Sequence, residues 1–127
     1  MKKGRVLEVG YVCPEDLRFL YSGATALVLP SWYEGFGLPV IEAWACCAPV
    51  IASNITSLPE VGGDAVEYVD PARSESIAAA MRRLAGDSTR RAELIVKGTE
   101  RLENYSWRRT AELTWDTLRP LLNGKKC

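Results

Sequence analysis

Short apolar runs that alternate with helical segments constrain the fold of this chain more than any other feature. Residues 26–30 (ALVLP) form a continuous apolar run, and residues 49–53 (PVIAS) form nearly one. Such runs are typical of parallel strands that are buried on both faces of a sheet. Residues 5–12 and 65–69 are predicted as two further strands, the second of which is closed by an Asp-Pro pair.

Helical segments are predicted between the strands. The first begins at Pro14, which is followed by two acidic residues, and runs to about Gly23. The second covers residues 37–47, directly after a loop with two glycines. Both would connect consecutive strands of a parallel sheet, as α/β folds require.

The second half of the chain is predicted to be mostly helical. Residues 74–85 carry apolar side chains at helical spacing, with Ser74 as the expected N-cap. Asp87 or Ser88 would cap the next helix, and Ser106 would cap the last. The fold class is therefore α/β: a Rossmann-like, partial parallel sheet of about four strands with flanking helices and a helical C-terminal tail. We expect the tail to pack over the sheet or to return toward another domain.

Composition limits the partners. The 127 residues contain 16 basic and 16 acidic side chains, so no net charge favours nucleic acid or an anionic membrane. No apolar run approaches the roughly 20 residues that span a bilayer, and the start of the chain leaves no room for the apolar region of a signal peptide. We expect residues 1–127 to form a single partial domain in the cytoplasm.

The chain has no histidine and four cysteines. The spacing of Cys13, Cys46, Cys47 and Cys127 matches no zinc pattern, so no metal site is expected. Cys46 and Cys47 follow an apolar stretch and are interpreted as core thiols. Without histidine, Ser-His and Cys-His nucleophiles are excluded, which leaves carboxylates and backbone dipoles as the chemical groups.

The most informative stretch is residues 29–42 (LPSWYEGFGLPVIE). A predicted strand ends there and a loop leads into a helix, which is where open α/β sheets bind ligands. Gly35 and Gly37 would let the backbone approach a ligand closely, and the amides at the helix start suit a diphosphate. Many such turns contain two glycines for steric reasons, so the loop alone does not identify a site.

Two carboxylates frame this loop. Glu34 precedes the glycines and Glu42 lies inside the helix. A carboxylate can accept hydrogen bonds from both hydroxyls of a vicinal diol, as in a ribose or hexose ring. The alternative is that Glu42 is a solvated helix residue and Glu34 a turn residue, and the spacing alone does not decide between the two interpretations.

The run from Glu34 to Glu42, two glutamates separated by seven residues, resembles the signature of the retaining GT-B glycosyltransferases of family 4. The order and spacing of further stretches are similar to the same family: VCPEDL (12–17), LYSGA (20–24), PVIAS (49–53), LPEVG (58–62), YVDP (68–71) and YSW (105–107). The resemblance covers roughly residues 5–118.

The resemblance implies roles for these residues. Glu34 would contact hydroxyls of the donor sugar and is the catalytic candidate, and Glu42 would bind the ribose hydroxyls of the nucleotide. Backbone amides would contact the sugar and the diphosphate at Gly35, Phe36, Gly37 and Leu38. The partner would be a nucleotide-diphosphate sugar, whose sugar is transferred with retained configuration, usually without a required metal; no cofactor is expected. Amides and the helix dipole would stabilise the leaving diphosphate.

The sequence departs from the family pattern by absences. The N-terminal acceptor domain is not present, nor is the strand ending in Gly-Arg, with a nearby Lys, that would neutralise the donor phosphates. The chain is therefore expected to be a truncated donor-binding domain that is inactive alone. In the family's strand order 3-2-1-4-5-6 it would keep strands three to six, leaving residues 26–30 as a bare edge. We expect a homo-oligomer formed through this edge, or movement of the first strand into the gap.

A third departure concerns Cys47, which stands where the family has the glycine that ends the signature helix. A left-handed conformation at Cys47 would cost roughly 1 kcal/mol relative to glycine.

Other prominent residues receive structural interpretations. Trp32 and Tyr33 could cover a sugar or base, but packing is favoured. Glu60 is either a local cap or a ligand contact. Core or interface positions are predicted for Trp44, Trp107 and Trp115, and solvated helix faces for the pairs Arg82-Arg83 and Arg90-Arg91.

A second class of function remains open on the sequence. The chain could be a non-catalytic remnant that acts as an interaction or oligomerisation module, or one subunit of a split enzyme. The intact pair of Glu34 and Glu42 favours donor binding, because a scaffold has little need of both carboxylates.

Overall fold

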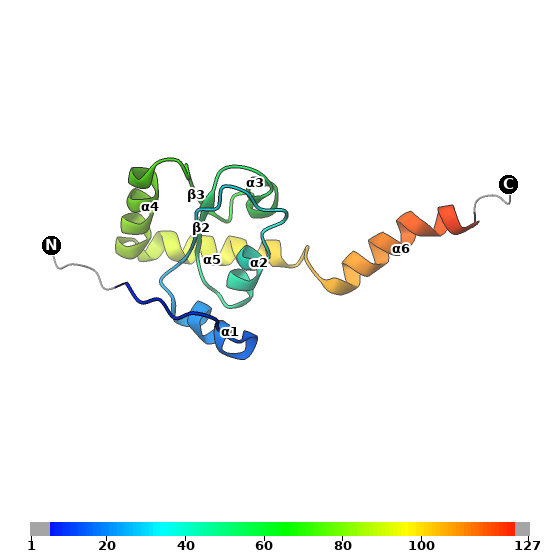
Figure 1. Cartoon of the computed structure of the whole chain (residues 1–127), viewed down its shortest axis with the longest axis horizontal. Coiled ribbons are helices and arrows are strands. Elements are labelled where there is room, and N and C mark those ends of the chain that lie inside the picture. Colours follow the sequence, from blue (N-terminus) through cyan, green and yellow to red (C-terminus); the bar gives the residue numbers. More distant parts are fainter. Residues whose placement is uncertain (1–5, 124–127) are drawn as a thin grey trace.

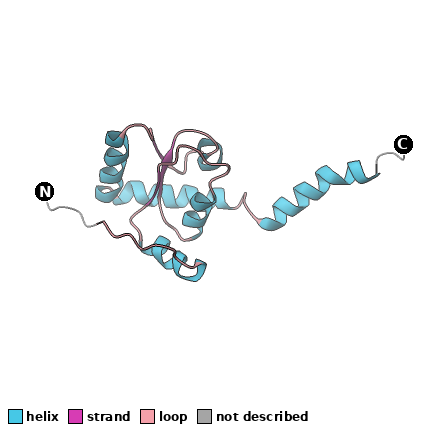
Figure 2. Cartoon of the chain, in the orientation of Figure 1, coloured by secondary structure: helices cyan, strands magenta, loops and turns pink. Residues whose placement is uncertain are grey.

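The computed structural model describes residues 6–123 and confirms the α/β fold class (Figures 1 and 2). In chain order, the described elements are α1 (Pro14–Gly23), β1 (Leu27–Leu29), α2 (Leu38–Ala45), β2 (Val50–Ser53), α3 (Leu58–Gly62), β3 (Glu67–Val69), α4 (Ser74–Gly86), α5 (Ser88–Leu102) and α6 (Trp107–Asn123). The sheet has three parallel strands in the order β1-β2-β3, with Leu27 opposite Val50 and Ile51 opposite Glu67.

The central strand β2 is buried along its whole length, and its side chains alternate between two cores. Val50 and Ala52 face a cluster that includes Trp44 of α2. Ile51 faces a second cluster that includes Leu84 of α4 and Leu94 of α5. The sheet is thus covered on both faces, as the continuous apolar run of this strand predicts.

The predicted first strand is wrong. Residues 6–12 form no strand, and Gly10 has φ +65°, which interrupts an extended conformation. Within residues 6–123, β1 pairs only with β2, so the expectation that β1 lies at an edge is confirmed. Movement of the first segment into the gap is not observed: residues 6–12 join no strand of the sheet, and Val6 and Tyr11 are exposed.

Several helix boundaries agree with the sequence. The helix α1 spans the predicted residues, and α5 is capped by Asp87, whose Oδ1 accepts a hydrogen bond from the amide of Arg90 at 2.8 Å. Ser106 Oγ accepts from the amide of Arg109 at 3.1 Å, which confirms the cap of α6. The predicted cap at Ser74 is wrong, because the helix already includes that residue. The short helix α3 was not predicted.

Both ends of α2 need left-handed backbone. Gly37 caps the start with φ +100°, and a Cβ there would lie 2.8 Å from Cδ2 of Leu58. At the other end Cys47 has φ +55°, which confirms the expected left-handed conformation. The amides of Cys47 and Ala48 donate to the carbonyls of Trp44 and Ala43, both at 2.9 Å, in a Schellman motif. Cys47 is exposed, so its interpretation as a core thiol is wrong, since a residue beyond the helix end points away from the core.

A buried carboxylate lies where the sequence indicates only an apolar strand. Glu67 of β3 is 6% exposed and pairs with Arg83 of α4 and with Arg90 of α5, whose Nη2 lies 3.1 Å from Oε2. The prediction that these arginines only form solvated helix faces is therefore wrong, because their guanidinium groups satisfy the charge of Glu67 and join two helices to the sheet.

The last helix, α6, projects away from the rest of the molecule (Figure 1). The expectation that the helical tail packs over the sheet is confirmed for α4 and α5, whose Leu84 and Leu94 pack with Ile51 of β2. It does not hold for α6, because residues 106–122 are all exposed. Trp44 lies in the core as predicted, whereas Trp107 and Trp115 are 81% and 55% exposed. Among the residues that the structure describes, no helix has the length and apolar character needed to cross a bilayer.

Candidate functional site

The loops that follow β1 and β2 meet at one edge of the sheet. Because the strands are parallel, their carboxyl ends lie together, where α/β proteins bind ligands. Two hydroxyls join the loops at Glu34: its amide donates to Thr56 Oγ1 at 3.3 Å, and its carbonyl accepts from Ser57 Oγ at 2.8 Å. The main chain of Glu34 is therefore held through both its N–H and its C=O group.

The carboxylate of Glu34 is also oriented. Ser31 Oγ donates to Oε1 of Glu34 at 2.8 Å, within the same loop. Within residues 6–123, Oε2 accepts no hydrogen bond, so this oxygen keeps its capacity to accept hydroxyl donors. Glu34 is half-buried, which leaves its carboxylate accessible from one side.

The start of α2 presents several backbone donors. Among residues 6–123, the hydrogen bonds include none that is donated by the amides of Gly35, Phe36, Gly37 or Leu38. Pro39 has no N–H, and the amide of Val40 already donates to the carbonyl of Gly37 at 3.0 Å. The positive end of the helix dipole lies at the same place, so this loop and helix start can accommodate an anion.

Glu42 lies one turn further along α2, on its exposed face. The hydroxyl of Tyr21 in α1 donates to Oε2 of Glu42 at 3.1 Å. Burial, followed by the charge of Glu42, raises the pKa of Tyr21 to about 12, so the range of pH over which the phenol stays a neutral donor extends further into alkali. The exposure of Glu42 agrees with a solvated helix residue and also leaves its carboxylate accessible to a ligand.

Aromatic rings surround the loop. Phe36 packs edge-on against Tyr105, with ring centroids 6.0 Å apart and an interplanar angle of 81°. Trp32 and Tyr33 are 67% and 80% exposed, so the packing role favoured for them is wrong in this chain.

Thr56 is the one strained residue of this edge. It has φ +58°, which is rare for a β-branched residue. Strained backbone of this kind persists only where the surrounding structure enforces it, and it is concentrated at functional sites. Here the conformation accompanies the hydrogen bond between Thr56 Oγ1 and the amide of Glu34.

The sequence did not identify four residues of this edge. Ser31 is local to the loop, and its position three residues before Glu34 was the only signal available. Tyr21, Thr56 and Ser57 contact the two glutamates across 21 to 23 residues of sequence, and no local pattern indicates such contacts.

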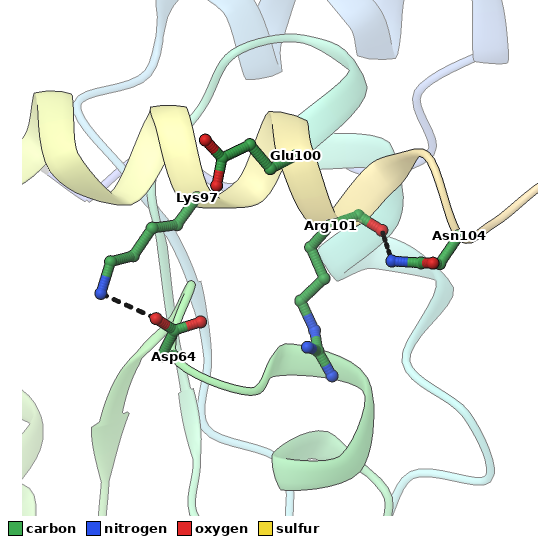
Figure 3. Close-up of a pocket in the computed structure, with 5 residues that line it drawn as sticks. All are labelled: Asp64, Lys97, Glu100, Arg101 and Asn104. Carbon is green, nitrogen blue, oxygen red and sulfur yellow. Dashed lines mark hydrogen bonds and ion pairs between the residues drawn. The ribbon is translucent and has the colours of Figure 1, made fainter.

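A separate polar pocket lies beside α5 and is lined by Asp64, Lys97, Glu100, Arg101 and Asn104 (Figure 3). Lys97 Nζ lies 2.8 Å from Asp64 Oδ2. Arg101 points toward α3 and donates to the carbonyls of Val61 and Glu60, both at 2.6 Å. These contacts satisfy carbonyls at the end of α3, so Arg101 has a structural role.

Glu60 itself lies exposed in the first turn of α3, where an acid suits the helix dipole. The sequence allows either a local cap or a ligand contact for Glu60, and the exposure of its side chain is compatible with both.

Comparison with known proteins identifies the family. Residues 2–101 match the family described as "Glycosyl transferases group 1". The chain is 42% identical over 106 residues to the O-antigen chain mannosyltransferase B of Escherichia coli, a match that covers 84% of this chain and 28% of the relative. It is 37% identical over 101 residues to the D-inositol 3-phosphate glycosyltransferase of Rhodococcus opacus, covering 78% of this chain and 23% of that protein.

A solved structure is also similar. The sucrose-phosphate synthase of Thermosynechococcus elongatus superposes with a TM-score of 0.83 at 33% identity, and the match covers 92% of this chain and 30% of that one. This chain therefore spans less than a third of each of these proteins. Because the match to this family covers most of the chain, residues 2–101, the chain belongs to the glycosyl transferases group 1.

Proposed function

We propose that this chain is the donor-binding part of a retaining glycosyltransferase and binds a nucleoside-diphosphate sugar. One observation carries the proposal: two kinds of group that such a ligand needs occur along one short segment. The amides of residues 35–38, at the start of α2, have no acceptor among the described residues, and the carboxylates of Glu34 and Glu42 lie on either side of them.

Each group has a distinct task in this proposal. The amides and the helix dipole bind the diphosphate and stabilise the charge that develops on it as the sugar leaves. Glu34, the catalytic candidate, uses Oε2 to accept hydrogen bonds from sugar hydroxyls, while Ser31 holds Oε1. Glu42 accepts hydrogen bonds from the ribose diol. The backbone and side chains do this without a metal or a cofactor, and the acceptor binds outside this chain.

The proposal is tested by calorimetric titration of UDP, GDP and ADP into the purified chain. Binding of one nucleotide, weakened in Glu42→Ala by at least about 1 kcal/mol, the scale of one net hydrogen bond, is the expected result. Glu75→Ala is the matched control, because Glu75 is an exposed helical acid at the start of α4. Addition of EDTA should leave the affinity unchanged if no metal is involved.

Absence of binding by all three nucleotides, from protein with a cooperative unfolding transition, would overturn donor binding by this chain. The name of the Escherichia coli relative makes a mannosyl nucleotide the first sugar donor to titrate once the base is known.

A second candidate, an oligomerisation module, is supported by the open edge of the sheet. Within residues 6–123, β1 has β2 as its only partner, so its outer edge offers backbone groups to another strand. In this interpretation two copies associate through that edge. Sedimentation velocity over a wide range of protein concentration tests it: a species of twice the monomer mass supports association, and a monomer at every concentration contradicts it.

A further inference from the structure

We propose that Tyr21 is a positioning residue for Glu42 and makes the nucleotide site select ribose over 2′-deoxyribose. This inference rests on the proposed function, because it assigns to Glu42 the recognition of a ribose diol. It concerns a side chain of α1 that lies outside the segment from Glu34 to Glu42.

Tyr21 is anchored where Glu42 is not. Its ring packs against the core cluster that includes Trp44 and Val50, and the side chain as a whole is half-buried. Glu42 is exposed, and within residues 6–123 its carboxylate has no hydrogen-bond donor other than the Tyr21 hydroxyl, at 3.1 Å. A fixed hydroxyl therefore holds one oxygen of a side chain that would otherwise sample several rotamers.

The hydrogen bond leaves room for a ligand. An ionised carboxylate offers about four acceptor positions, and the Tyr21 hydroxyl occupies one of them on Oε2. A vicinal diol needs two, so Glu42 can bind Tyr21 and both ribose hydroxyls together. A tyrosine hydroxyl is protonated throughout the neutral range, so Tyr21 remains a donor there, and burial and the charge of Glu42 raise its pKa further, to about 12.

Orientation matters more for two hydrogen bonds than for one. A ribose diol must meet the carboxylate with both hydroxyls aligned, whereas a 2′-deoxyribose makes a single hydrogen bond that tolerates rotation. Loss of the Tyr21 hydroxyl should therefore weaken the binding of ribonucleotides more than the binding of 2′-deoxynucleotides. If Tyr21 acted through packing alone, Tyr21→Phe would weaken the binding of both kinds of nucleotide by the same factor.

The experiment compares UDP, GDP and ADP with dUDP, dGDP and dADP by calorimetric titration into the wild-type chain and into Tyr21→Phe. We expect the wild type to prefer the ribonucleotide of its base, and Tyr21→Phe to reduce that preference by about fivefold, the scale of one net hydrogen bond. Tyr68→Phe is the matched control, because its hydroxyl donates to the carbonyl of Leu58 at 3.4 Å and lies outside the proposed contacts.

In the background of Glu42→Gln, where the carboxylate is lost, Tyr21→Phe should have little further effect on the preference. Tyr21→Met is the second variant if the phenylalanine variant unfolds, because an unbranched side chain fills irregular core space without offering a hydroxyl.

The outcomes separate the two proposals. Wild-type protein that binds no nucleotide overturns the proposed function and this inference with it. A ribonucleotide preference that is as strong in Tyr21→Phe as in the wild type overturns the positioning role alone, while donor binding stands. A reduced preference in Tyr68→Phe of the same size would also overturn the assignment to Tyr21.

Discussion

The sequence predicts both α2 and α6 as helices that carry large apolar side chains, yet α2 is packed into the core and α6 is exposed. The shorter, α2, has eight residues, and its Val40, Ala43 and Trp44 are buried. The longer, α6, has 17 residues, and every described side chain along it is exposed. At about 100° per residue, one arc of α6 collects most of its apolar side chains, with Leu113 outside it: Trp107, Ala111, Trp115, Leu118, Leu121 and Leu122.

Periodicity therefore predicts a helix and its apolar face, but it does not predict which surface covers that face. The helix α2 is held at both ends by left-handed residues, at one side by Tyr21, and over its face by α5, where a Cβ at Gly98 would collide with the indole of Trp44. The helix α6 is held locally, by the cap at Ser106 and by ion pairs within the helix. Each prediction below tests whether α2 is as constrained, and α6 as independent, as the structure indicates.

The largest expected difference is between Trp44→Ala and Trp115→Ala. Trp44 is 2% exposed, so its truncation should lower the free energy of unfolding by about 3–5 kcal/mol. Trp115 is 55% exposed, so its truncation should change that free energy by less than about 0.5 kcal/mol. Urea unfolding of both variants measures the difference, and a large loss in Trp115→Ala would mean that α6 is packed against something in solution.

Elements that depend on local patterns could be predicted from the sequence, whereas elements that depend on a partner surface could not. The helix α1, the central strand and the loop from β1 to α2 depend on local patterns, and the sequence predicted them. The predicted first strand failed because a strand forms only against a partner, and residues 6–12 have none in the described sheet. Trp32 and Trp115 are exposed because no other part of the described chain covers them, and a local residue pattern cannot predict that.

For the candidate site, the sequence predicts Glu34 and Glu42 as the residues that carry chemistry, but not the residues that contact them. Glu34 and Glu42 follow from a spacing within one segment. Tyr21 and Thr56 approach them from other elements, and the hydrogen bonds that join them exist only after the chain has folded. The burial of Glu67 beside two arginines likewise depends on contacts between elements that are distant in the sequence.

The next largest effect is expected at the start of α2. In Gly37→Ala, a Cβ would lie 2.8 Å from Leu58 Cδ2 at a residue with φ +100°. Backbone strain of about 1–2 kcal/mol and a displaced side chain at about 1–2 kcal/mol together predict a loss of about 3 kcal/mol. Gly35→Ala is the control, since a Cβ there meets nothing within 4 Å. Equal stability of both variants in thermal or urea unfolding would show that the start of α2 can relax.

A smaller effect is expected at high pH from the contact between α1 and α2. The pKa of Tyr21 is raised to about 12 in the folded chain, mainly by burial and then by Glu42. Because the folded pKa lies above the unfolded one, the stabilisation is complete below about pH 10 and is lost as the pH rises toward 12. Discounted for the partial exposure of the ring, the loss is about 1 kcal/mol.

Unfolding of the wild type and of Tyr21→Phe at pH 9 and near pH 12 measures this loss, and the titration of other groups cancels in the comparison. Identical pH dependence of the two proteins would show that the pKa of Tyr21 is not raised in the folded chain, by burial or by Glu42.

The smallest effect is a gain in stability at the end of α2. Cys47 has φ +55°, which costs a residue with a side chain about 1–2 kcal/mol, and glycine would lose about 0.5–1 kcal/mol through its greater freedom in the unfolded chain. Cys47→Gly should therefore raise the free energy of unfolding by about 0.5–1 kcal/mol. Cys46→Gly, one residue earlier at φ −103°, should lower it, because that position has no left-handed strain to relieve. If both variants lose stability by the same amount, then Cys47 leaves the left-handed conformation in solution, and the Schellman motif does not define the end of α2.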